Sequence, residues 1–207
     1  MKKVYIFLSS GISPAAFYLA HYRESRNEGD LVICADGGYR IARGLGLFPD
    51  LVIGDLDSLE RDKVEGEVLK YPAEKDFSDF ELALLKAGEF LPDSVIVYGA
   101  LGGRKDHEIT NILVLAFSLI PLVFIEEEVE IFNVIHTLRL EGKKGSICSL
   151  LPFGGPCFVE EVRGFRYPLR QEELLPSSRG LSNIILENEA QVSIKRGNLV
   201  VVVVKKG

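Results

Sequence analysis

The sequence predicts an α/β protein, in which a mostly parallel sheet flanked by helices is followed by a smaller all-β sandwich. Up to about residue 127, short β-branched runs alternate with helical segments, which is typical of parallel strands joined by helices. Beyond that point, short β-rich runs follow one another between glycines and prolines at turn spacing, which favours a sandwich or barrel. The change of pattern predicts two domains, residues 1–127 and residues 128–207.

The elements of the first half are predicted from apolar runs and from helical periodicity. Pro14 is well placed as the first residue of a helix that ends near Arg23. The expected strands are residues 4–8, 31–35, 51–53, 67–71 and 94–99, and the expected helices are 14–23, 39–45, 77–90 and 107–119. Phe77 and Phe80 are expected on the core side of their helix. The apolar stripe of the last helix is Ile109, Ile112, Leu113, Ala116, Phe117 and Ile120.

The second half is predicted to contain strands and no good helix. The expected strands are residues 129–135, 137–140, 147–151, 158–162, 183–186, 191–195 and 199–205. The segment from Val200 to Val204 is continuously apolar, so a sheet, a helix or another subunit must cover it. This requirement favours a dimer.

Composition excludes several classes of protein. A chain of 207 residues with a formal charge of −6 lacks the basic surface that a nucleic-acid backbone requires, whereas small anions carried by Mg²⁺ remain acceptable partners. The stretch 112–125 is too short and too interrupted to span a membrane, and the apolar run after Lys3 is too short for a signal peptide. Three cysteines without metal-binding spacing fit a reducing cytoplasm.

Four acidic motifs lie within the first 110 residues, and three of them directly follow β-branched runs. The motifs are Ala35-Asp36-Gly37-Gly38, Gly54 to Ser58 (GDLDS), Asp76 to Asp79 (DFSD) and Gly102 to His107 (GGRKDH). Because ligands of open α/β sheets bind beyond the carboxyl ends of the strands, these carboxylates are expected on one rim. Crowded aspartates and glycines there favour a metal phosphate as the ligand.

Two of these motifs are candidates for holding a cation. Asp55 and Asp57 would point the same way if the backbone stayed extended, although an aspartate-rich turn explains them equally well. Asp76 and Asp79 share one face of a first helical turn; Asp76 is the candidate helix cap, which leaves Asp79 as the candidate ligand.

The other two motifs are candidates for binding phosphate. Gly102, Gly103 and Arg104 offer flexible backbone and a fixed positive charge at a helix start, where Asp106 caps the helix or holds metal. His107 and Asn111 share a helix face, a pair more often structural than catalytic. The turn Asp36-Gly37-Gly38 permits close approach of a nucleotide or simply joins a strand to a helix. No P-loop and no GxGxxG fingerprint occurs.

As a set, the motifs resemble those of the thiamin pyrophosphokinase family in order and spacing. The residues that carry the resemblance are the four motifs above with Pro49 to Ile53, Gly99 to Leu101, Asn111, Gly164 to Leu169 (GFRYPL) and Ser178 to Asn183 (SRGLSN). Leu56 replaces the commoner phenylalanine and Ser78 replaces threonine, and the stacking aromatic that some members place near the thiamin ring is not obvious.

The resemblance implies a thiamine diphosphokinase that transfers the pyrophosphoryl group of ATP to the hydroxyl of thiamin and releases AMP. It implies a Rossmann-like ATP- and Mg²⁺-binding catalytic domain at 1–127, and a β-sandwich at 128–207 that binds thiamin and forms a homodimer. The implied catalytic residues are Asp55, Asp57, Asp79 and Asp106, of which the first three hold Mg²⁺. The implied ATP-binding residues are Asp36, Gly37, Gly38, Gly102, Gly103, Arg104, His107 and Asn111, and the thiamin-binding residues are Ser182 and Asn183.

Three alternatives use the same motifs. One is a diphosphokinase that acts on another small alcohol, such as a hydroxymethyl pterin. Another is a non-catalytic nucleotide or thiamin sensor, which would bind without consuming ATP. A third is a metal-dependent phosphohydrolase, in which the carboxylates would activate water. The nucleotide released from ATP distinguishes these classes.

Overall fold

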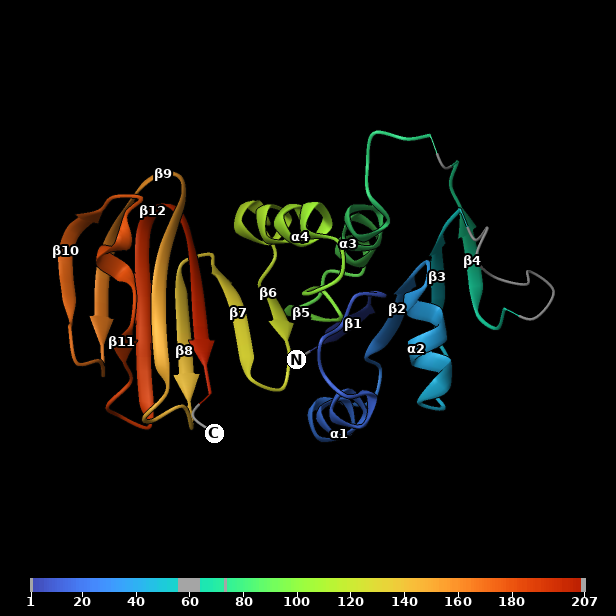
Figure 1. The fold of residues 1–207 in the computed structure, drawn as a ribbon, viewed down its shortest axis with the longest axis horizontal. Helices are drawn as coiled ribbons and strands as arrows, with labels where there is room; N and C mark the ends of the chain where they lie inside the picture. Colours follow the sequence, from blue (N-terminus) through green and yellow to red (C-terminus); the bar gives the residue numbers. More distant parts are fainter. Residues whose placement is uncertain (1, 56–63, 73, 206–207) are drawn as a thin grey trace. The chain divides into compact units, whose positions relative to one another are not determined.

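The computed structural model describes residues 2–55, 64–72 and 74–205, and its chain divides into two compact units (Figure 1). The first unit comprises residues 1–114 and 122–127, and the second comprises residues 115–121 and 128–207. The two units are described separately below. No helix in the described part of the chain is long and apolar enough to cross a membrane.

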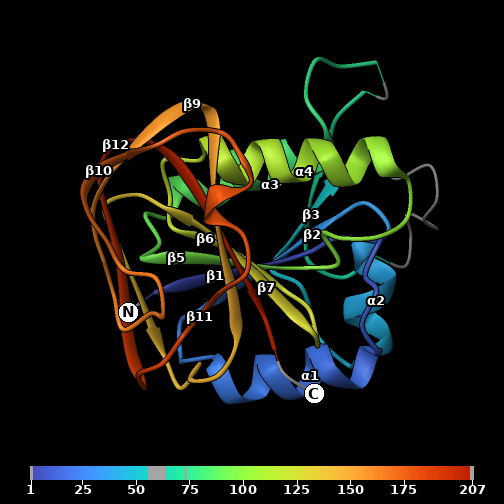
Figure 2. The same cartoon turned by 60° about the vertical axis from the view of Figure 1, so that its left-hand side comes forward.

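The first unit is built on parallel strands with helices on both faces. The strands are β1 (Lys3–Phe7), β2 (Leu31–Ala35), β3 (Leu51–Gly54), β4 (Glu67–Lys70), β5 (Ser94–Tyr98) and β6 (Leu122–Ile125), in the spatial order β6-β5-β1-β2-β3-β4. The helices are α1 (Ala15–Ser25), α2 (Gly38–Gly44), α3 (Asp79–Glu89) and α4 (Lys105–Phe117). Figure 2 shows the strands between α1 on one side and α3 and α4 on the other.

The strand order of the first unit creates a crevice beside β1. The chain builds the sheet outward from β1 through β2, β3 and β4, then crosses to the other side of β1 to add β5 and β6, all by parallel pairing. The helices that follow β1 and β5 therefore lie on opposite faces of the sheet, and the carboxyl edge at such a point is where open α/β sheets bind ligands. Central side chains such as Ile33 and Val97 are fully buried, so this edge rests on a rigid base.

The second unit is antiparallel and is organised by two long strands, β9 (Ile147–Arg163) and β12 (Glu189–Val204). β12 also pairs with β7 (Val129–Val134) and β8 (Thr137–Glu141), while β9 pairs with β10 (Leu169–Leu174) and β11 (Asn183–Ile184). A 3-10 turn, η2 (Ser178–Gly180), precedes β11. The core of this unit consists of inward-facing residues such as Leu150, Val159, Val192 and Val201.

The strands of the second unit differ from the prediction in number and length. β9 joins the two strands expected at 147–151 and 158–162 into one. β12 likewise joins the two strands expected at 191–195 and 199–205. Gly154 and Gly197 have φ of +71° and +88°, and the β12 register with β9 shifts between Arg196 and Asn198. The glycines therefore bend and bulge these strands instead of ending them. β10, which is largely polar, was not anticipated.

The apolar segment at the end of β12 is covered by neighbouring strands. Residues 199–204 pair with β7 on one side and β9 on the other, and Val200, Val201 and Val203 are buried. The exposed edge considered from the sequence does not exist here, because the sheet itself supplies both neighbours.

Two predictions about the helices need correction. Ser78, not Asp76, is the N-cap of α3: its hydroxyl accepts from the Glu81 amide at 3.2 Å, and the Glu81 carboxylate accepts from the Ser78 amide at 2.8 Å. On α4, the predicted core stripe is only partly buried. Ile109, Leu113 and Phe117 are 60%, 44% and 52% exposed and Ile112 and Ile120 are half-buried, whereas Ala116 is buried as predicted.

Candidate functional site

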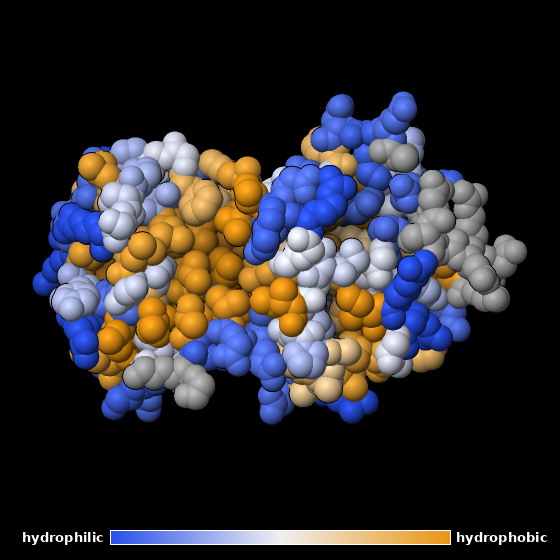
Figure 3. Space-filling model, in the orientation of Figure 1, coloured by the Kyte–Doolittle hydropathy of each residue, from blue (hydrophilic) through white to orange (hydrophobic). Residues whose placement is uncertain are grey.

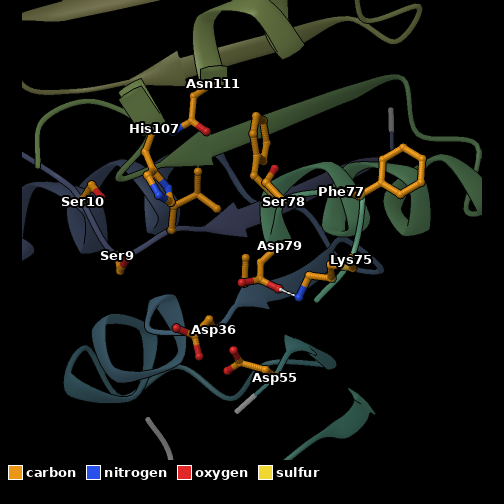
Figure 4. A pocket seen from close by; sticks show the side chains of 13 residues that line it. Ser9, Ser10, Asp36, Asp55, Lys75, Phe77, Ser78, Asp79, His107 and Asn111 are labelled. Carbon is orange, nitrogen blue, oxygen red and sulfur yellow. Dashed lines mark hydrogen bonds and ion pairs between the residues drawn. The ribbon is translucent and has the colours of Figure 1, made fainter. Parts of the chain in front are cut away.

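A pocket of about 300 Å³ lies in the first unit, beyond the carboxyl ends of its central strands (Figure 4). Most of its lining comes from the four acidic motifs and from the loop after β1. The lining residues are Leu8, Ser9, Ser10, Ala35, Asp36, Asp55, Lys75, Phe77, Ser78, Asp79, Phe80, His107 and Asn111. The predicted site residues that meet in this pocket are Asp36, Asp55, Asp79, His107 and Asn111.

Asp36 directly follows β2 and has a left-handed backbone conformation, with φ of +40°. Its amide donates to the Ile53 carbonyl at 2.8 Å, and its carbonyl accepts from the Tyr39 amide at 3.0 Å, so the strained turn is held from both sides. A non-glycine residue in this conformation is energetically unfavourable, and such residues persist where the surroundings fix them. Asp36 is therefore held rigidly with its carboxylate on the pocket, as Figure 4 shows.

The two glycines after Asp36 serve local packing. A Cβ on Gly38 would lie 1.9 Å from the Phe7 carbonyl oxygen, and one on Gly37 would lie 3.0 Å from the Ser9 Cβ. Only glycine therefore lets α2 begin against the end of β1. Of the two sequence-based explanations for this pair, the close strand-to-helix turn is the one that these contacts support.

Asp55 and Asp79 bring two further carboxylates to the pocket. Asp55 follows β3, and Asp79 is the first residue of α3. The Lys75 ammonium donates to Asp79 Oδ1 at 2.8 Å. Asp57, the remaining predicted metal ligand, lies outside the described residues.

The carboxylates fit a hard divalent cation that arrives with a phosphate. Among the described residues, no group of three or more His, Cys, Asp or Glu side chains is assembled closely enough to hold a metal by itself. Mg²⁺ commonly binds through one or two carboxylates together with substrate phosphates and water, and does not need an all-protein cage. Asp36, Asp55 and Asp79 provide such oxygen donors around one cavity.

The motif after β5 is divided between the pocket and its surroundings. His107 and Asn111 line the cavity from one face of α4, and the buried Asn111 amide donates to the Ala100 carbonyl at 2.8 Å. Gly102 and Gly103 have φ of +88° and +66°, and both pack against Ser10. A Cβ on Gly102 would lie 2.8 Å from the Ser10 carbonyl oxygen. These glycines therefore permit the loops after β1 and β5 to approach closely.

Arg104 and Asp106 are exposed and bonded to each other, and neither lines the pocket. Arg104 Nη2 donates to Asp106 Oδ2 at 2.6 Å, and Arg104 Nε donates to Asp106 Oδ1 at 3.2 Å. The hydrogen bond from Arg104 lowers the pKa of Asp106 to about 2. Asp106 is therefore an ionised partner of Arg104 and a weak proton acceptor at neutral pH.

The predicted thiamin-binding residues lie in the second unit and differ in exposure. Ser182 is exposed, has φ of +57°, and donates its amide to the Ser149 hydroxyl at 3.1 Å. Asn183 is buried: its Oδ1 accepts from the Tyr167 amide at 3.0 Å, and its Nδ2 donates to the Tyr167 carbonyl at 2.8 Å. The Asn183 side chain thus joins the GFRYPL and SRGLSN segments to each other.

Several lining residues are not predicted as site residues from the sequence. Ser9 and Ser10 have the composition of an ordinary loop, although they follow a buried strand just as three of the acidic motifs do. Phe77 was expected on the core side but is half exposed and lines the pocket, whereas Phe80 is buried as expected. Lys75 carried no signal, because only the fold brings its side chain to the carboxylates.

Fold and site together define a class of protein. Parallel strands whose carboxyl edge carries a small polar cavity with three carboxylates define an α/β protein built for a small, highly polar ligand. Two family models match the chain: "Thiamin pyrophosphokinase, catalytic domain" over residues 22–123, and "Thiamin pyrophosphokinase, vitamin B1 binding domain" over residues 135–199. The chain belongs to the thiamin pyrophosphokinase family.

Known proteins with the same family name resemble the chain along most of its length. Thiamine pyrophosphokinase of Bacillus subtilis is 29% identical over 188 residues, which cover 85% of this chain and 88% of that protein. Thiamine pyrophosphokinase 1 of rice is 29% identical over 199 residues, covering 79% and 75%. The crystal structure of the Bacillus subtilis protein has the same fold, with a TM-score of 0.83 at 24% identity and full coverage of both chains.

Proposed function

We infer that the protein is a thiamine diphosphokinase, which transfers the pyrophosphoryl group of ATP to the hydroxyl of thiamin and yields thiamin diphosphate and AMP. The observation that carries this conclusion is that Asp36, Asp55 and Asp79 line one cavity within the segment matched as the catalytic domain. The thiamin hydroxyl oxygen bonds to the β-phosphorus, the bond from that phosphorus to the α-phosphate oxygen breaks, and the hydroxyl proton is lost.

We propose that Mg²⁺ is held by Asp55, Asp57 and Asp79 together with phosphate oxygens. Bound there, the cation would neutralise charge on the transferred group, which is the main requirement of a loose phosphoryl-type transition state. The protein's own part is to hold the carboxylates fixed. The capping box at Ser78 fixes the start of α3, and hence the backbone of Asp79.

We propose that the remaining pocket residues hold the nucleotide. The hydroxyls of Ser9 and Ser10 and the ring of His107 face the cavity and suit phosphate oxygens or the ribose. Arg104 would bind phosphate through its guanidinium, and Asp106, which accepts from Nε and Nη2 of that guanidinium, would orient it. Asp106 and Asp79 are the two candidates for receiving the hydroxyl proton; each already has a cationic partner, and a loose transition state requires little base catalysis.

We propose that the second unit, a β-sandwich, binds thiamin and forms a homodimer. The match to the vitamin B1 binding domain supports the first assignment, and Ser182 is an exposed hydrogen-bonding group within that match. Apolar side chains on the surface support the second, and Figure 3 shows such atoms gathered over strands of the second unit. The three cysteines are buried without disulfides, which supports a reducing cytoplasm.

The test is to mix the protein with ATP, Mg²⁺ and thiamin and to identify the nucleotide released. Stoichiometric AMP and thiamin diphosphate are expected. ADP would indicate a simple kinase, release of phosphate or pyrophosphate without thiamin would indicate a hydrolase, and tight binding without turnover would indicate a sensor. If AMP formed with a hydroxymethyl pterin but not with thiamin, the pterin would be the alcohol substrate of the enzyme.

One variant tests the metal site in the same assay. We expect Asp57→Asn to lower the rate of AMP formation by about 100-fold or more while the melting temperature stays unchanged, since asparagine removes the charge but keeps nearly the same size and shape. Circular dichroism and the AMP assay on the same preparation check both expectations. Near-normal turnover in this variant would remove Asp57 from the metal site.

A further inference from the structure

Lys75 stands out among the pocket residues by its charge. The lining contains three carboxylates, whereas Lys75 is the one lysine or arginine among its described members. Arg104 and Lys105, the cations of the neighbouring motif, are exposed and paired with Asp106 and Glu108 outside the lining. If this cavity binds a triphosphate, Lys75 is the cationic side chain among the described lining residues that can contact the phosphates.

The contact between Lys75 and Asp79 is not an ordinary helix-surface ion pair. Although the residues are four apart, α3 begins at Asp79, so Lys75 belongs to the preceding loop and helical spacing does not bring them together. Its side chain is 15% exposed, the lowest value among the ion-paired cations in the described part of the chain. Figure 4 shows the lysine turned toward the carboxylate that faces the cavity.

Asp79 therefore has two competing partners. In the structure it accepts from the Lys75 ammonium, and in the proposed reaction it binds Mg²⁺. A divalent ion on Asp79 would stand within a few ångströms of the ammonium, and two cations at that distance repel strongly. The four-carbon stem of lysine is flexible, so the ammonium can swing away while its backbone stays in place. The phosphate oxygens that bind together with the metal would then accept the hydrogen bond from the Lys75 ammonium.

We propose that Lys75 is a positioning residue that exchanges partners: it holds Asp79 in the absence of ligand and moves onto the polyphosphate when Asp79 takes the divalent ion. This inference rests on the proposed function, because it deepens the description of the same site. The exchange keeps the carboxylate oriented beforehand and delivers a positive charge to the phosphates only when the metal is present.

The exchange predicts opposite effects on two ligands. Lys75→Met is expected to weaken binding of the unreactive α,β-methylene analogue of Mg·ATP by about 10-fold or more, because a charge-assisted hydrogen bond is lost. The same variant is expected to bind Mn²⁺ alone about 3-fold more tightly, because the cation that competes for Asp79 is gone. Calorimetry measures the first affinity, and the loss of the free Mn²⁺ EPR signal measures the second.

Three further variants serve as controls. Lys86→Met removes a lysine from an ion pair of similar length, in which Lys86 lies 2.7 Å from Glu89. This pair lies at the end of α3 opposite to Asp79 and outside the pocket lining. Both affinities should stay as in the unchanged protein. Lys75→Arg keeps the charge and should retain most of the nucleotide affinity. Lys75→Gln keeps a hydrogen-bond donor for Asp79 but removes the charge. Its affinities for the nucleotide analogue and for Mn²⁺ should shift in the same directions as those of Lys75→Met. It therefore serves as a second test in case methionine disturbs the loop.

Two outcomes would overturn the proposal. Unchanged nucleotide affinity in Lys75→Met and Lys75→Gln would mean that Lys75 does not reach the phosphates. A fall in both affinities would mean that it merely supports the loop. Failure of the proposed function would be seen separately. If the two affinities shifted in opposite directions but the protein made no AMP from ATP and thiamin, the exchange would be supported and the proposed reaction refuted. If the protein made AMP but the two affinities did not shift in this way, the reaction would be supported and the exchange refuted.

Discussion

At the scale of single residues, the motifs identify the chemistry of the site but not the backbone that presents it. Asp36 and Ser182, chosen from the sequence for their side chains, both have left-handed backbones. Asn183, chosen for its hydrogen-bonding groups, bonds to the Tyr167 backbone. A residue type predicts which contacts a side chain can make, whereas its actual partner depends on segments distant in sequence. Lys75 was missed for the same reason.

Asp36 permits a test that separates backbone strain from charge. We expect Asp36→Asn to change the free energy of unfolding by less than about 0.5 kcal/mol, because asparagine tolerates the left-handed region as well as aspartate does. Asp36→Ala should lower it by about 1 kcal/mol, because alanine does not. Both variants should lose most activity through the missing carboxylate. Urea unfolding and AMP release measure the two effects. Equal stability of the two variants would show that φ at this position carries no strain.

Asn183 is expected to matter for stability independently of any ligand. In Asn183→Ala, the Tyr167 amide and carbonyl lose their partners, so the free energy of unfolding should fall by about 2 kcal/mol. Asn27→Ala is the control, because Asn27 lies in an exposed loop. Thermal unfolding without thiamin compares the two. If both variants melted with the unchanged protein, the structural role of the Asn183 amide would be refuted and its role toward thiamin would stand alone.

At the scale of elements, the parallel half was easier to predict than the antiparallel half. The boundaries of β2 agree with those expected, and β1 and β5 differ by one residue, because a buried parallel strand is a compact apolar run between polar loops. In the second unit the same reasoning divided β9 and β12 at their glycines. A glycine indicates that the backbone leaves the ordinary strand conformation, but only the pairing partner decides whether it turns back or continues through a bulge.

The start of α2 permits a matched test of close packing. In Gly38→Ala, the new methyl group would overlap the Phe7 carbonyl, so α2 or β1 must shift. We expect the free energy of unfolding to fall by about 3 kcal/mol. Gly44→Ala, at the other end of the same helix, meets no atom within 4 Å and should raise it by about 0.5 kcal/mol through helix propensity. Chemical denaturation distinguishes the two, and a neutral Gly38→Ala would mean that this turn is not closely packed.

At the scale of the whole molecule, periodicity found the apolar stripe of α4 but not what covers it. Periodicity places the stripe in the core, yet Ile109, Leu113 and Phe117 are exposed in the single chain, although Ala116 is buried. An amphipathic pattern reports only that one face avoids water; a sheet and a second protein molecule satisfy it equally. The location of the pocket was more predictable, because the strand order places the ends of β1, β2 and β3 at one edge.

The exposed stripe leads to a prediction about assembly. If the interface of the proposed homodimer extends beyond the second unit to this face of α4, Leu113→Asp would place an unpaired charge in it, which is strongly unfavourable. We expect the dissociation constant of the dimer to rise by about 100-fold, measured by sedimentation equilibrium over a range of protein concentrations. Leu91→Asp is the control, because Leu91 is a highly exposed leucine in the loop after α3. A dimer that tolerates Leu113→Asp as well as Leu91→Asp would have its interface elsewhere. A monomeric unchanged protein would refute the homodimer itself.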